Sequence, residues 1–414
     1  IAQDGATRYA LTCLQGDILR ALGESVGSIE AFGRALETAA DDNERARAWI
    51  GQAEGMRIVD RYDEALAALD QAQTAAAALG RADQLTQIHF LRGNLFFPLG
   101  NLDGCLAQHE LAREYSRKSG SVEGEARALG GLGDAYYQRG RMITGHKHFR
   151  RCVELSRENG FCAIEAANLS MVGFSRFFLN ELREALEDGL ATIAAAAKIG
   201  HQRAELLARI LVYWVFFEMT DMENARKHLR EAQILAERLG ARRFEAQNLL
   251  YMTKFSRVEG RRSEARKLCE EAHGISRVTG IGFVGPHVCA EVARNTEDQG
   301  ARRQALQEGE KILREGAVSH NHFHFYAEAM EACLESKEWD EVDRYAGALE
   351  EFTRPEPLPW SDFFIKRGRT LAAFGRGNRE DSTMQALKQL RGEAERVGLR
   401  MALPALDAAL AAVS

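Results

Sequence analysis

The chain has 414 residues, which is enough for two or three globular domains or for one long array of repeats. Its formal net charge of −6 argues against a nucleic-acid partner, because proteins of that class usually present a basic face to the phosphates. The longest apolar run, Ile210–Phe217, is too short to span a bilayer. We therefore predict neither a nucleic-acid partner nor a membrane partner.

Cysteines are dispersed along the chain without a CxxC or a zinc-ribbon spacing. The set consists of Cys13, Cys105, Cys152, Cys162, Cys269, Cys289 and Cys333. An odd, scattered set is typical of reduced cysteines that serve as small hydrophobic residues, so we predict a cytoplasmic protein. The chain begins at Ile1 rather than at Met and already within a helical pattern, so we expect a fragment of a larger protein.

Glycine marks helix ends at a regular interval. One series is spaced by 40 residues and a second lies halfway between its members: Gly80, Gly120, Gly160, Gly200, Gly240 and Gly280, then Gly100, Gly140, Asn180, Thr220, Gly260 and Gly300. Glycine is preferred just past a helix C-terminus because it adopts the left-handed conformation without strain. Two stop signals per repeat predict two helices of about 15–18 residues each. No segment alternates with period two, so no strand is predicted.

Small residues recur in the same register. Near the start of each second helix they are Ala65, Cys105, Gly145, Ala185, Ala225, Ala265 and Ala305, and seven residues later Ala72, Ala112, Cys152, Thr192, Ala232 and Ala272. Gly93, Gly133 and Gly173 form a third ladder in the first helices. Residues at this spacing share a helix face, so the ladders predict that neighbouring helices approach each other closely.

In chain order, the pattern predicts about ten helix pairs. They begin near residues 6, 42, 81, 121, 161, 201, 241, 281, 318 and 359. Pro98 should kink or shorten its helix, whereas Pro286 lies early in its helix and is tolerated. Three prolines within Thr353–Pro359 forbid a helix there. We divide the chain into an array of about nine pairs (1–352), a Pro-rich connector (353–359), and a C-terminal pair with a capping helix (360–414).

These residues carry a family resemblance. The segment Leu132–Tyr136, followed by Gly140, resembles the first-helix pattern of tetratricopeptide repeats, and Glu64-Ala65 with Leu69 and Ala72 resembles the second-helix pattern. The period is longer than the family's usual one, so each helix should be nearly one turn longer. The resemblance implies an all-α fold, a right-handed superhelical solenoid of antiparallel helix pairs.

Long-period arrays of this kind also resemble the C-terminal sensor regions of large bacterial signalling ATPases. Some of these ATPases carry DNA-binding regulators of the MalT type, and others carry class III adenylate or guanylate cyclase domains. The segment Leu358–Phe364, with Arg367-Gly368-Arg369 after it, resembles the cyclase group most. The resemblance implies a regulatory array attached to an ATPase and an output domain.

Candidate binding residues follow from the family's groove positions, one and four residues after the first-helix glycine ladder. The two series are Glu54, Asn94, Asp134, Phe174, Trp214, Lys254 and Arg294, and Arg57, Phe97, Tyr137, Phe177, Phe217, Arg257 and Glu297. Aromatic residues in the middle repeats and basic residues in the later ones suit a peptide with apolar anchors and a carboxylate. In the alternative interpretation, the aromatic side chains face the next helix and fill the interior.

Histidine spacing raises one metal hypothesis. His320, His324 and Glu328 stand at i, i+4 and i+8 and so share a helix face, with His322 on another face. His146 and His148 are two residues apart and cannot share a face. One helix face seldom supplies a complete site, so we assign these residues to packing and predict no metal and no cofactor.

No catalytic motif was found: the sequence has no P-loop, H-E-x-x-H, G-x-S-x-G or kinase signature. We therefore predict a non-enzymatic scaffold that binds a protein or peptide segment. The bound segment could belong to another domain of the scaffold's own parent chain. The alternative is a sensor that binds a metabolite between Phe174 and Phe217. A third hypothesis is self-assembly, in which apolar faces of the end helices pair two copies as a homodimer.

Overall fold

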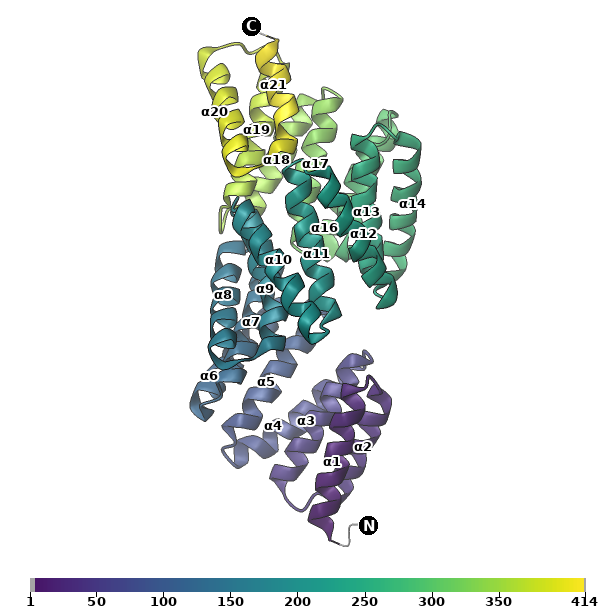
Figure 1. Ribbon diagram of the computed structural model, residues 1–414, viewed down its shortest axis with the longest axis vertical. Coiled ribbons are helices and arrows are strands. Elements are labelled where there is room, and N and C mark those ends of the chain that lie inside the picture. The colour runs from purple at the N-terminus through teal and green to yellow at the C-terminus, as the bar shows by residue number, and fades with distance from the viewer. Residues whose placement is uncertain (1–3, 413–414) are drawn as a thin grey trace. The chain divides into compact units, whose positions relative to one another are not determined.

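The structure is a computed structural model that describes residues 4–412. In this range the chain forms α-helices and two short 3-10 helices and no strand, which confirms the predicted all-α array of antiparallel helix pairs. Figure 1 shows the helices in chain order, from α1 near the N-terminus to α21 near the C-terminus. No helix among these residues has the length and apolar character needed to cross a membrane.

The chain divides into two compact units, which are described separately. Unit 1 comprises the residues up to Ala135 together with Arg151–Ile164, and unit 2 comprises Tyr136–Arg150 and the residues from Glu165 onward. The helices that begin in unit 1 are α1 (Gly5–Ala21), α2 (Ser25–Thr38), α3 (Asp42–Ile58), α4 (Tyr62–Ala78), α5 (Ala82–Phe96), α6 (Leu102–Ser119) and α7 (Val122–Gln138). The boundary between the units passes through α7, α8 (Met142–Asn159) and α9 (Cys162–Phe178).

Unit 2 continues the same pattern to the end of the described chain. Its remaining elements are α10 (Leu182–Ile199), α11 (Gln202–Glu218), α12 (Met222–Arg238), α13 (Arg242–Val258), α14 (Arg262–Thr279), η1 (Ile281–Phe283), α15 (Gly285–Arg294), α16 (Gln299–Gly316), α17 (His320–Glu335), α18 (Trp339–Thr353), α19 (Pro359–Gly375), α20 (Asp381–Val397), η2 (Arg400–Ala402) and α21 (Leu403–Ala411). The observed starts of the first helices lie within a few residues of the predicted ones.

The helices end where the two glycine series predict, with one exception. Positive φ values of 60° to 110° occur at every predicted stop from Gly80 to Gly280, including Asn180 and Thr220. The prediction for Gly300 is wrong, because this residue lies in the first turn of α16. There α15 already ends at Arg294, and the Asp298 side chain caps the next helix by accepting from the Ala301 N–H at 2.6 Å. Pro98 has the predicted effect, since α5 ends at Phe96.

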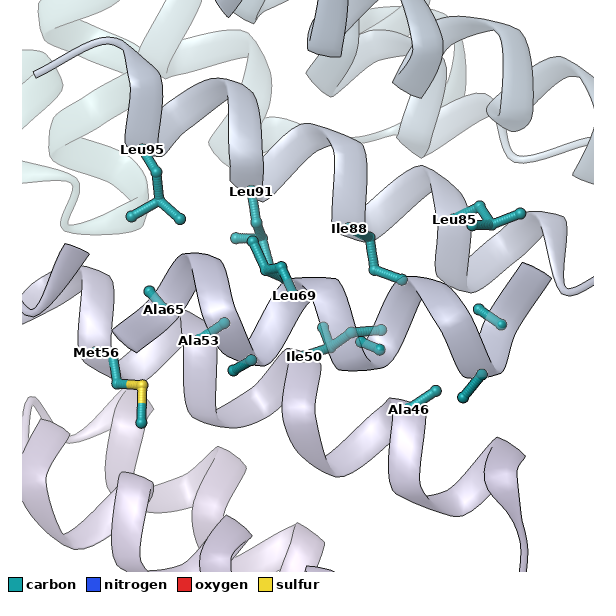
Figure 2. Packing of buried hydrophobic residues seen from close by; sticks show 14 of the residues in the cluster. Ala46, Ile50, Ala53, Met56, Ala65, Leu69, Leu85, Ile88, Leu91 and Leu95 are labelled. Atoms are coloured by element: carbon teal, nitrogen blue, oxygen red, sulfur yellow. The ribbon is translucent and has the colours of Figure 1, made fainter. Parts of the chain in front are cut away.

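The small-residue ladders lie where helices touch. Ala65, Cys105, Ala185, Ala225 and Ala265 have no exposed surface. In unit 1 the core lies between α3, α4 and α5, and Figure 2 shows Ile88 and Leu91 of α5 directed toward the helices beneath them. Burying such apolar surface contributes roughly 25 cal/mol per Å², so each interface adds stability that a single helix pair lacks.

Within unit 2, the Pro-rich segment contacts the start of α8. The Glu356 carboxylate accepts hydrogen bonds from the backbone N–H groups of Ile143 at 2.8 Å and Thr144 at 3.3 Å. These N–H groups belong to the first turn of α8, where an anion is stabilised by the helix dipole. The connector between α18 and α19 therefore fixes helices more than 200 positions apart in sequence. The proposed division of the chain into domains at this connector stays a prediction.

A substitution in the glycine ladder tests the packing. A Cβ at Gly93 would lie 2.6 Å from the His109 ring, and a Cβ at Gly131 would lie 2.3 Å from the same ring on its other side. His109 is buried and held between these two glycines, so it cannot move away. We expect Gly93→Ala to lower the free energy of unfolding by about 1–3 kcal/mol in chemical denaturation. The control is Gly274→Ala, where the new methyl group meets no atom within 4 Å. In this variant the free energy of unfolding should rise by about 0.5–1 kcal/mol. Equal effects would contradict this account.

Candidate functional site

The inward helices of unit 2 bring several of the predicted aromatic residues together. Phe174 and Phe177 of α9 contact Trp214 of α11 edge-on, with ring centroids 5.0 and 5.3 Å apart. All three side chains are buried. Trp214 also meets His324 of α17 at 4.7 Å, a contact between helices separated by more than 100 residues. These aromatic side chains therefore pack against other parts of the same unit.

A second contact closes this interior. Phe178 of α9 lies 4.7 Å from Phe323 of α17 and 5.6 Å from Trp360 of α19, measured between ring centroids. Phe178 and Phe323 have no exposed surface. Offset and edge-on aromatic pairs at these distances contribute about 0.5–1.5 kcal/mol beyond their area. The centre of unit 2 is thus filled by its own rings, as the alternative interpretation of the sequence expects.

The three predicted basic residues also lie together, and each is paired. The Lys254 Nζ donates to Glu328 Oε1 at 2.6 Å, and Arg294 also donates to this carboxylate. Arg257 donates from Nε and Nη2 to the two oxygens of Glu291 at 3.0 and 3.2 Å, a two-pronged pair. The side chain of Glu291 has no exposed surface. These basic residues thus meet carboxylates of their own chain.

Buried histidines continue the network along the same helices. His287 of α15 and His324 of α17 stack with ring centroids 4.8 Å apart and planes 10° apart. Burial holds the pKa of both imidazoles well below the usual value, with Lys254 adding to the effect. Lys254, Arg294 and Arg257 hold the pKa of the Glu328 carboxyl well below its usual range despite burial. The histidines are therefore neutral and the carboxylate is ionised near neutral pH.

Glu218, at the end of α11, differs from the other carboxylates of this region. Burial raises the pKa of its carboxyl to about 7, against the opposing attraction of Lys254 and Arg367. Glu328 and Glu331 raise it further by like-charge repulsion. A carboxyl group with such a pKa titrates in the physiological range, which is where functional groups are often found.

Unit 1 carries an open groove, which we call the α1–α7 groove. It has a volume of about 530 Å³ and is lined by residues of α1, α3 and α5 and of the start of α7. Its lining consists of Arg20, Arg47, Ile50, Glu54, Arg57, Ile58, Asp83, Thr86, Gln87, Phe90, Leu91, Ser121, Glu123, Gly124 and Arg127. Both signs of charge therefore surround an apolar floor, and the volume falls within the usual range of ligand sites, about 300–1,000 Å³.

The predicted groove positions separate into distinct settings. Glu54 and Arg57 line the α1–α7 groove, whereas Asn94 is half-buried and Phe97 and Asp134 are exposed in unit 1 without lining that groove. In unit 2 the buried or half-buried members are Tyr137, Phe174, Phe177, Trp214, Phe217, Lys254, Arg257 and Arg294. The groove residues of α3 extend from Arg47 to its last residue, Ile58, while those of α7 lie in its first turns. The groove therefore crosses the helices obliquely, and a fixed offset cannot follow it.

Sequence reasoning named Glu328 only for its spacing from the histidines and missed the other carboxylates of the network. Glu291 and Glu218 were not among the candidate residues, and His287 was not linked to His324. One signal was present: the pattern H-x-x-x-E occurs at His287 and Glu291 and again 37 residues later at His324 and Glu328. Because the interval is close to the repeat length, both pairs occupy matching faces of successive first helices.

Comparison with known proteins shows a likeness of fold alone. No protein-family model and no curated protein matches the chain. The structure of a Rap protein complexed with competence and sporulation factor has a TM-score of 0.59 at 11% identity, covering 93% of this chain and 99% of the other. Aspartyl phosphate phosphatase F from Bacillus subtilis has a TM-score of 0.55 at 10% identity, covering 87% and 96%.

A third structure, the apo form of RapI, has a TM-score of 0.54 at 12% identity and covers 66% of this chain and 99% of that protein. The fold class that these likenesses and the helix-pair pattern define is a tetratricopeptide-like helical-repeat solenoid. At these identities the comparisons carry no residue roles from one protein to another.

Removing Arg257 tests whether the network is structural. We expect Arg257→Ala to lower the free energy of unfolding by about 3–5 kcal/mol, because it leaves the Glu291 carboxylate buried without its two-pronged partner. The matched control is Arg262→Ala, which removes an exposed arginine paired with exposed Glu297 and should change stability by less than about 1 kcal/mol. Chemical denaturation measures both. Similar small effects would show that Glu291 is not held by Arg257.

Glu218 predicts a pH-dependent stability. Its pKa of about 7 lies above the usual 4.5, so between these values the folded state binds more protons than the unfolded state. The stability it contributes is therefore present below pH 4.5 and lost as the pH rises through 7. We expect Glu218→Gln to become more stable relative to wild type across this window, by about 1–3 kcal/mol. A difference in unfolding free energy that stays flat with pH would contradict the assignment.

Proposed function

We propose that this chain is a regulatory scaffold that binds an extended protein or peptide segment in the α1–α7 groove of unit 1. The observation that carries the proposal is the groove itself, with arginine and carboxylate side chains around an apolar floor made by Ile50, Phe90 and Leu91. Extended segments suit such grooves, because polar contacts fix their register while an apolar side chain provides an anchor.

The charges of the groove suggest the chemistry of the segment. Arg20 and Arg47 share Asp17 at 2.9 and 2.6 Å, and Arg127 pairs with Glu123 at 2.7 Å. These pairs are partly exposed, so an incoming carboxylate can exchange with them at little cost. A segment with at least one acidic side chain and one apolar anchor therefore fits the groove best.

The comparisons support this class of function without establishing it. One Rap protein of similar fold was solved in complex with competence and sporulation factor, so this architecture can hold a ligand. The finer hypothesis, that the array is the sensor region of a bacterial signalling ATPase with a cyclase or a regulator as output, rests on the sequence resemblance. A metabolite sensor between Phe174 and Phe217 would require the buried rings there to separate.

A peptide-binding experiment tests the proposal. Peptides selected by panning a random phage-displayed library on the chain are labelled, and their affinities are measured by fluorescence anisotropy. We expect Arg127→Glu to weaken binding by about tenfold or more, because a groove cation is replaced by a like charge to the acidic peptide. The matched control is Arg151→Glu, which reverses an arginine of similar exposure outside the groove, paired with Glu154 at 3.3 Å.

Circular dichroism checks that both variants stay folded. Unchanged affinity in the control and a loss in Arg127→Glu support the groove. Equal affinities in the two variants, or a library that yields no saturable binder, would overturn the proposal.

A further inference from the structure

Two helices of unit 2 present the same pair of side chains to one another. His287 and Glu291 lie one turn apart on α15, and His324 and Glu328 lie one turn apart on α17, the next first helix and a direct neighbour in space. Residues at this spacing share a helix face, so each helix offers an imidazole and a carboxylate together. The donor atoms of His287, Glu291 and Glu328 all lie within 4.8 Å of one another.

The histidines of this cluster have polar atoms that no other described group satisfies. The Nε2 atoms of His287 and His324 are buried and have no hydrogen-bond partner among residues 4–412. A buried polar atom left without a partner costs about 1–3 kcal/mol, so such atoms mark places where a further group is expected. By contrast, His320 on the same helix bonds to the Phe283 carbonyl oxygen at 3.0 Å.

We propose that His287, Glu291 and Glu328 bind a divalent transition-metal ion such as Zn²⁺. One imidazole nitrogen and two carboxylate oxygens form a three-ligand set that zinc accepts, with water in the fourth position. The inference concerns unit 2 and does not depend on peptide binding in unit 1.

The surroundings of the ligands have the features that metal sites need. The Glu291 carboxylate is held by Arg257, which fixes its orientation as outer-shell hydrogen bonds do in known sites. The imidazole of His287 is neutral, which is the ligating form. The His287 imidazole and the Glu291 carboxylate therefore have the protonation state and the support that metal ligands need.

The same cations limit the affinity. Lys254, Arg257 and Arg294 oppose a second positive charge, and both oxygens of the Glu328 carboxylate already accept from cations, Oε1 from the Lys254 Nζ at 2.6 Å and Oε2 from Arg294. A metal ion must therefore compete with Lys254 and Arg294 for the Glu328 carboxylate. This competition gives the site a signature that a structural salt-bridge network lacks: neutralising Lys254 should strengthen metal binding.

Metal titration tests the site. The full chain is dialysed against a chelator and then titrated with Zn²⁺ by calorimetry and with Co²⁺ by its ligand-field absorption, which reports nitrogen and oxygen coordination. We expect one ion per chain, an affinity lowered by about tenfold or more in His287→Gln, and a higher affinity in Lys254→Met than in wild type. His320→Gln, a buried histidine of α17 already bonded to a carbonyl, is the matched control and should bind as wild type does.

Circular dichroism and thermal melting show whether each variant is folded. Glutamine keeps the polar character of His287, and if that variant unfolds, the Lys254→Met comparison still decides. Absence of binding in wild type, equal binding by wild type and His287→Gln, or weaker binding in Lys254→Met would each overturn the proposal.

Discussion

Successive helix pairs in the middle of this chain bring their two helices together at a position taken by a small residue. Ala65, Cys105, Ala185, Ala225 and Ala265 are completely buried at these contacts. Elsewhere, a methyl group added at Gly173 would lie 2.3 Å from Leu211 of the neighbouring first helix. Because cores are packed as densely as organic crystals, such contacts fix the distance between helices within narrow limits. The 40-residue period and the helix caps matter because they return a small residue to the same place in each repeat.

This constraint leaves the inward faces of the first helices free to differ between repeats. In unit 1 these faces carry arginines and carboxylates around a groove with an apolar floor. In unit 2 the corresponding region is filled by Phe174, Phe177, Trp214 and their partners from α17 and α19. A single architecture thus supports an open groove in one unit and a packed interior in the other, with different side chains on the inward faces.

The fold could be predicted because its signals are local. A glycine after a helix, or Asn180 and Thr220 in its place, adopts positive φ for reasons contained within a few residues. Where the prediction failed, at Gly300, an equally local signal competed: Asp298 begins α16 before the glycine is reached. The reduced spacing of the repeats there follows from that earlier start.

The candidate site could be predicted only in part, because its pairings are distant in sequence. The family's groove offsets placed Lys254, Arg257 and Arg294 on one surface, but the sequence contains no rule by which Lys254 meets a carboxylate 74 residues away. Likewise, a fixed offset from the glycine ladder found Glu54 and Arg57 in the groove and missed Phe90. Such a rule treats successive helices as parallel copies, whereas the groove crosses them at a different height on each one.

The charge network of unit 2 is not explained by stability alone. Replacing a buried ion network with apolar residues is often neutral or stabilising, so the fold does not require these charges. Their partners come from three consecutive first helices, α13, α15 and α17, so each ion pair links one repeat to another. A ligand that takes Glu328 from Lys254 and Arg294 therefore alters two inter-helix contacts at once. In such an array each repeat contacts mainly its neighbours. Binding that breaks contacts between helices can therefore alter the geometry of the surrounding repeats.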